Sequence, residues 1–79
     1  MSPAVLRSGP YRFYFVNHDL HEPPHVHIDR NSYSAKFRLR PVALAYNLGF
    51  PANELRKFAA ITYENQNKLL EALYEYFGT

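Results

Sequence analysis

The sequence predicts an α+β fold in which an antiparallel sheet of three or four strands packs against one long C-terminal helix. Three observations predict this fold. Apolar and polar residues alternate with period two in the first half of the chain, no glycine or proline interrupts residues 52–77, and apolar residues recur there at helical spacing. Because 79 residues are enough for one small domain, we expect a single domain over residues 1–79.

The sheet is predicted from three clear strands and one ambiguous segment. The first strand covers about residues 11–17, where aromatic side chains alternate with other residues. Pro23 and Pro24 come next and favour a rigid, extended backbone, because proline restricts its own backbone and that of the residue before it. A second strand is therefore expected at about residues 25–30. A third strand follows at about residues 33–39. Residues 42–46 fit either a strand or a short helix, and we favour the strand.

The hairpin formed by the second and third strands can be predicted residue by residue. A two-residue turn at Asn31 and Ser32 pairs the apolar residues of the two strands with one another on one face of the sheet. On the other face this register pairs His25 with Arg38, His27 with Lys36, and Asp29 with Ser34.

The helix is expected over about residues 52–77, with Pro51 at its start and Gly78 at its end. Its apolar stripe is interrupted at Gln66, and we expect residues 65–67 to mark a bend. The charged residues of the helix are expected to form a solvated face: Glu54, Arg56, Lys57, Glu64, Lys68, Glu71 and Glu75.

Composition excludes several classes of protein. The chain has no cysteine, which excludes disulfides, a thiol nucleophile and cysteine-ligated metals. It has no apolar run long enough for a signal peptide or a membrane span, so we expect a cytoplasmic protein without membrane contact. A formal charge of +2 is too small to indicate nucleic-acid binding by itself. Aromatic residues on several sides of the helix are compatible with a homodimer.

The histidines are the most informative feature of the sequence. All four, His18, His21, His25 and His27, fall within ten consecutive residues. His25 and His27 are two apart on a predicted strand, so their imidazoles leave the same face and are close enough to share one ligand. Three interpretations stay open: a metal site, a phosphate-handling face, and polar residues with no role beyond solvation.

In the first interpretation the candidate metal ligands are His18, His21, His25 and His27, and the cofactor is a divalent metal such as zinc. Lys36 and Arg38, which are predicted to lie opposite the histidine pair, would repel a cation.

In the second interpretation the same cations attract an anion. The residues expected to bind RNA or DNA are Arg12, Tyr14, Lys36 and Arg38. The cations would hold phosphates and the tyrosine would stack on a base. His25 and His27 are then candidate catalytic residues, since imidazoles transfer protons near neutral pH, and the reaction would be metal-independent ribonuclease chemistry. The sequence leaves open whether the protein is an enzyme.

Several motifs together resemble a known family. They are Tyr-Arg-Phe-Tyr-Phe at 11–15, Glu-Pro-Pro-His-Val-His at 22–27, Ala-Lys-Phe at 35–37 and Leu-Ala-Tyr-Asn at 44–47. The chain resembles domain-of-unknown-function family 4160, small bacterial and archaeal proteins in which Pro-Pro-His-x-His is distinctive. The resemblance implies an uncharacterised protein whose gene often lies beside that of another small protein, in arrangements that look like toxin–antitoxin modules. It therefore implies a small partner protein encoded nearby, and it carries over no catalytic residue.

Overall fold

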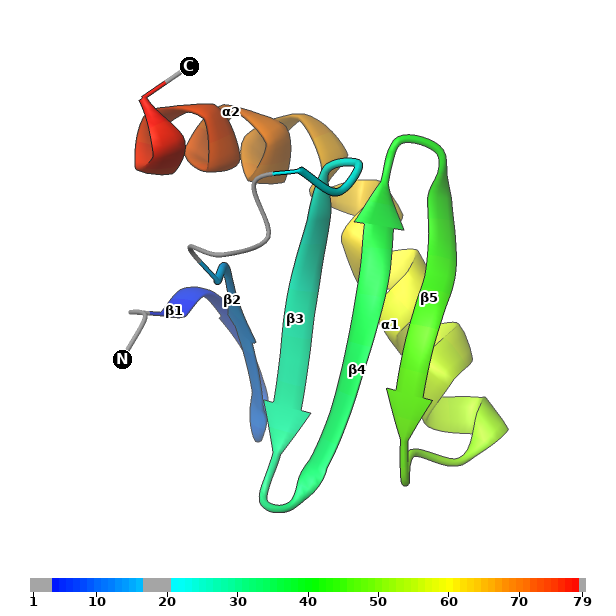
Figure 1. Ribbon diagram of the computed structural model, residues 1–79. Coiled ribbons are helices and arrows are strands. Elements are labelled where there is room, and N and C mark those ends of the chain that lie inside the picture. The colour runs from blue at the N-terminus through cyan, green and yellow to red at the C-terminus, as the bar shows by residue number, and fades with distance from the viewer. Residues whose placement is uncertain (1–3, 17–20, 79) are drawn as a thin grey trace.

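The computed structural model describes residues 4–16 and 21–78. Five strands form one antiparallel sheet whose order follows the chain, β1-β2-β3-β4-β5, and two helices come after it (Figure 1). The elements are β1 (Ala4–Ser8), β2 (Tyr11–Tyr14), β3 (His25–Arg30), β4 (Tyr33–Leu39), β5 (Val42–Leu48), α1 (Ala52–Glu64) and α2 (Gln66–Phe77). The α+β class is confirmed, whereas the expectation of three or four strands and one long helix is wrong.

The strand that the sequence pattern did not predict is β1, which pairs with β2 at one edge of the sheet. Its five residues include a charged Arg7 and show no clear alternation, so local periodicity could not identify it. β2 ends at Tyr14 and is shorter than predicted, and residue 17 lies outside the described residues. The ambiguous segment after β4 is a strand, as favoured, and it extends to Leu48.

The predicted hairpin of β3 and β4 is confirmed residue by residue. Arg30 pairs with Tyr33 across a two-residue turn, and Asn31 in that turn has a φ of 54°. Asparagine is among the residues that tolerate this left-handed conformation. The pairs of His25 with Arg38 and of His27 with Lys36 are those that the alternation predicted.

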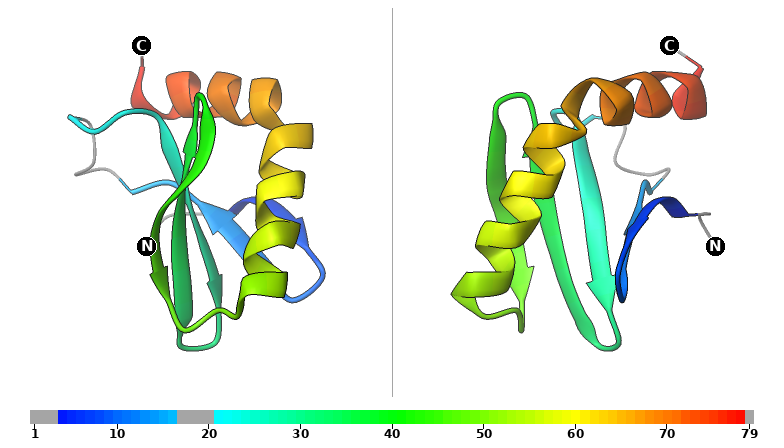
Figure 2. Two further views of the ribbon diagram at one scale, coloured as in Figure 1. Left: turned by 90° about the vertical axis from the view of Figure 1, so that its right-hand side faces the viewer. Right: turned by 180° about the vertical axis from the view of Figure 1, so that it is seen from behind.

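The predicted single helix is two helices that meet at Asn65. The side-chain amide of Asn65 donates a hydrogen bond to the carbonyl of Ile61 at 2.8 Å, as its backbone N–H does at 3.1 Å. Such local side-chain bonds compete with helix continuation. Gln66 donates to the carbonyl of Leu39 at 2.7 Å and so attaches the corner to the end of β4. The bend expected at residues 65–67 is therefore a change of direction between α1 and α2, which the two views of Figure 2 show.

The core lies between one face of the sheet and the two helices. Alternate residues of β2, β3 and β4, such as Phe13, Ile28 and Phe37, are buried there together with Phe58 of α1. α1 packs against β4 and β5, and α2 packs against β4. In Figure 1 α1 lies behind the sheet, and in the right-hand view of Figure 2 it lies in front. Neither helix covers the opposite face of the sheet, which we call the outer face.

Candidate nucleic-acid interface

Side chains of four strands reach the outer face in cross-strand rows. In an antiparallel sheet, residues that pair across strands project from the same face. Tyr14 pairs with His27, His27 with Lys36, and Lys36 with Tyr46. A row of aromatic, imidazole, ammonium and aromatic groups therefore crosses β2, β3, β4 and β5. A second row beside it runs from Arg12 through Asp29 and Ser34 to Leu48. On the other side, His25 pairs with Arg38.

The ring of Tyr14 is already engaged by its neighbours. The His27 ring stacks against it with centroids 5.3 Å apart and an interplanar angle of 24°, and the Arg12 guanidinium lies 4.6 Å from its centroid. Its hydroxyl donates to Oδ2 of Asp29 at 3.0 Å. Partial burial and then the bond to Asp29 raise the pKa of Tyr14 above its ordinary value. A nucleobase that stacked on Tyr14 would compete with these contacts.

Contacts made by His25 and by the two prolines account for part of the Pro-Pro-His-x-His motif. Its Nδ1 lies 2.9 Å from the carbonyl oxygen of Pro23, and the carbonyl of Pro24 accepts a bond from the N–H of Leu39 at 2.9 Å. Both prolines thus offer their carbonyls at the entry to β3, although neither has an N–H to donate. Because a carbonyl only accepts, Nδ1 carries the proton, and the lone pair of the neutral imidazole is on Nε2.

The two imidazoles lie together but differ in exposure. The centroids of the His25 and His27 rings are 5.2 Å apart. His25 is only 6% exposed, whereas His27 is half-buried. The pair that the sequence predicted is therefore formed, with one member held by the motif and the other stacked on Tyr14.

One cation of the outer face is paired with a carboxylate, and another is exposed to solvent. The Lys36 ammonium forms an ion pair with Glu22 at 2.8 Å, and Arg38 is exposed beside it. Since Glu22 is itself exposed, this pair contributes little to stability and a phosphate can compete for Lys36.

The predicted metal ligands are only partly placed by the structure. His18 lies outside the described residues, and within the described ranges His21, His25 and His27 do not form a group of three or more possible ligands with one another or with a carboxylate. Zinc binding by the four histidines stays a prediction.

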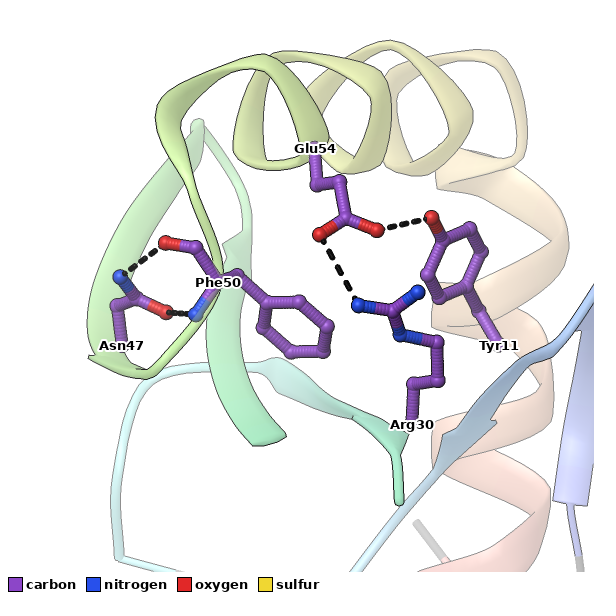
Figure 3. Close-up of polar contacts among 5 residues, drawn as sticks. All are labelled: Tyr11, Arg30, Asn47, Phe50 and Glu54. Atoms are coloured by element: carbon purple, nitrogen blue, oxygen red, sulfur yellow. Dashed lines mark hydrogen bonds and ion pairs between the residues drawn. The ribbon is translucent and has the colours of Figure 1, made fainter. Parts of the chain in front are cut away.

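A second polar cluster lies on the covered side of the sheet, and sequence reasoning missed it (Figure 3). Glu54, which was expected on a solvated face, is buried in the first turn of α1. It accepts a hydrogen bond from the Tyr11 hydroxyl and forms an ion pair with Arg30 at 3.4 Å. The expectation for Glu54 was wrong because a helix charge pattern does not reveal a tyrosine 43 positions earlier in the chain. The cluster joins sheet to helix and serves the fold.

In the part of the chain that is described, no helix has the length and apolar character needed to cross a membrane. No curated protein and no solved structure matches this chain. The family described as Domain of unknown function (DUF4160) matches residues 11–73, which is most of the chain and includes β2 to β5 and the Pro-Pro-His-x-His motif. The chain therefore belongs to the DUF4160 family.

Proposed function

We propose that this protein is the nucleic-acid-binding component of a toxin–antitoxin-like module and that it holds single-stranded RNA or DNA on its outer face. The observation that carries the proposal is the row of Tyr14, His27, Lys36 and Tyr46 across four adjacent strands. An open sheet face that combines aromatic rings with cations is a recurring way to bind single strands. The link to a module comes from the gene context that the family resemblance implies.

The cations supply the affinity in this proposal. Arg12, Lys36 and Arg38 come from β2 and β4 and flank the histidine pair of β3. Side chains so arranged can neutralise successive phosphates of an extended strand, and binding then depends on salt because counterions are released.

The test is fluorescence polarisation with single-stranded RNA and DNA oligonucleotides of about 10 nucleotides at low salt. A Lys36→Ala/Arg38→Ala variant should bind more weakly. The negative slope of log affinity against log salt should become less steep by about 1.4, which is about 0.7 for each phosphate that is no longer neutralised. The matched control is Arg56→Ala/Lys68→Ala, which removes two exposed cations from the helices. Equal losses of affinity in both variants, or no binding by the wild-type protein, would overturn the proposal. Binding of a protein partner instead would assign the face to protein recognition.

A second candidate function, metal-independent RNA cleavage, is favoured by the tautomer of His25. Its unprotonated Nε2 suits a base that takes the proton of a 2′-hydroxyl. The 2′-oxygen then attacks phosphorus, the bond to the 5′-oxygen breaks, and the imidazolium of His27 protonates the leaving oxygen. Arg38 and Lys36, which pair with these histidines, would stabilise the charge on phosphorus.

This reaction predicts cleavage in the presence of chelator, a bell-shaped pH profile and a 2′,3′-cyclic phosphate product. The informative variants are His25→Asn, which keeps an N–H within reach of the Pro23 carbonyl, and His27→Gln. Each should abolish cleavage, and His25→Asn, which changes no residue of the row that carries binding, should leave binding in place. Cleavage that survives in the double variant would come from a contaminant and would exclude this function.

A further inference from the structure

The edge strand β5 exposes more large apolar side chains than any other strand in the described residues. Leu44 is 44% exposed, Tyr46 is 51% exposed and Leu48 is 53% exposed. Burying such side chains in a core would be favourable, so their exposure requires an explanation. No charged residue occurs between positions 41 and 53, so β5 itself has none of the charges that commonly protect an edge.

A β-bulge decides which of these side chains reaches the outer face. Leu44 pairs with Phe37 and therefore projects toward the helices, whereas Tyr46 pairs with Lys36 and projects from the outer face. The register shifts between these two pairs, so residue 45 is the extra residue of a bulge. Without the bulge, Leu44 and Tyr46 would share a face, since they are two apart on one strand. The bulge thus places Tyr46 beside Lys36 on the outer face.

Tyr46 differs from Tyr14 at the other end of the same row. Tyr14 stacks on His27, lies under Arg12 and donates to Asp29. Among residues 4–16 and 21–78, the side chain of Tyr46 has no ring contact, hydrogen bond or ion pair. One tyrosine of the row is therefore built into the sheet surface, and the other presents its ring to solvent.

We propose that Tyr46 is the base-stacking platform of the outer face, with Lys36 holding the adjacent phosphate of a single-stranded nucleic acid. This inference rests on the proposed function and deepens it, because it names the residue that contacts a base. The expectation that Tyr14 stacks on a base stays a separate prediction. Every nucleobase has a π-face, so a site of this kind discriminates weakly between sequences.

The first test measures affinity by fluorescence polarisation with the same RNA and DNA oligonucleotides. Tyr46→Ala should weaken binding about 5- to 140-fold, because aromatic stacking is worth about 1–3 kcal/mol per base. Tyr46→Phe should bind like the wild-type protein, since it keeps the ring. The matched control is Tyr63→Ala, which removes a tyrosine of α1 that is 72% exposed. It should leave the affinity for the oligonucleotides unchanged.

The second test uses the absence of tryptophan from the chain. Tyr46→Trp introduces a single indole, whose fluorescence should be quenched when a base stacks on it, and Tyr63→Trp should not respond. Unchanged affinity in Tyr46→Ala with binding still present in the wild-type protein would overturn this inference and leave the proposed function standing. No binding by the wild-type protein would overturn both. Fluorescence of Tyr46→Trp that changes on dilution without oligonucleotide would assign the residue to a contact between two copies and would also overturn the inference.

Discussion

The hydroxyl of Tyr11 donates a hydrogen bond to Oε1 of Glu54 at 2.5 Å, which joins the first residue of β2 to the first turn of α1. Arg30, at the end of β3, contacts the other carboxylate oxygen at 3.4 Å. Both Tyr11 and Glu54 are buried. Because a buried polar group without a partner costs free energy, this contact favours one placement of α1 on the sheet.

Removal of the Glu54 carboxylate should destabilise the protein through Tyr11. We expect Glu54→Ala to lower the free energy of unfolding by about 1–3 kcal/mol, since the buried hydroxyl no longer has its acceptor. The Tyr11→Phe/Glu54→Ala double variant should cost less than the sum of the single variants. Urea denaturation measures all three, with Glu64→Ala, an exposed glutamate of the same helix, as the control. Strictly additive changes in the free energy of unfolding would contradict the coupling.

Stability should fall at alkaline pH partly through Tyr11. The hydrogen bond to Glu54, followed by burial and the charge of Glu54, raises the pKa of Tyr11 above its ordinary value of 10.0. A raised pKa in the folded state means that the folded protein keeps the proton when the unfolded chain loses it. This contribution to stability is therefore fully present below pH 10 and is lost as the pH rises through the folded-state pKa.

The measurement is urea denaturation at several pH values from about 9 to about 11.5. Tyr11→Phe should lose less stability over this range than the wild-type protein. Tyr63→Phe, which removes an exposed hydroxyl, should follow the wild-type curve. Parallel curves for Tyr11→Phe and wild type would show that the pKa of Tyr11 does not differ between the folded and unfolded states.

Gly49 should tolerate no side chain in the turn from β5 to α1. Its φ is +99°, and a Cβ there would lie 2.5 Å from Cδ1 of Tyr33. The turn is also held by Asn47, whose side chain bonds the N–H and carbonyl of Phe50 (Figure 3). We expect Gly49→Ala to cost about 2–4 kcal/mol from backbone strain and the clash together.

Gly9 provides the matched control for that prediction. It also has a positive φ, +56°, but a Cβ there would meet nothing within 4 Å. Gly9→Ala should therefore cost only about 1–2 kcal/mol. Thermal or urea denaturation measures the stability of both variants. Equal stability would mean that the clash with Tyr33 does not add to the cost of Gly49→Ala.

His25 should contribute to stability whatever its role in function. His25→Ala removes the donor to the Pro23 carbonyl and the packing of a buried ring, so we expect the free energy of unfolding to fall by about 1–3 kcal/mol. His25→Asn should recover part of this stability because its amide can donate to the same carbonyl. The exposed His21 gives the control, and His21→Ala should change stability by less than about 0.5 kcal/mol. Equal stability of His25→Ala and wild type would mean that the motif has no structural role.

The sequence predicted best where short-range rules decide the structure. The hairpin of β3 and β4 has a period of two and a two-residue turn, and these suffice to pair His25 with Arg38 and His27 with Lys36. The helical region was identified from its periodicity, and Gly78 ends α2 in the left-handed conformation. The central residues of the outer face therefore follow from alternation and turn length alone.

The tertiary structure decided what depends on contacts between distant parts of the chain. β1 is a strand because β2 offers it a partner, and α1 stops at Asn65 while Gln66 bonds to the end of β4. Glu54 is buried because Tyr11 and Arg30 surround it.

By itself, then, the sequence determined the fold class, the central hairpin and the histidine pair, because alternation and turn chemistry act over a few residues. Only the tertiary structure placed Tyr46 beside Lys36 and engaged Tyr14 with its neighbours. The physical reason is that a bulge changes the face of every residue after it, and the pairing that creates the bulge is made with another strand.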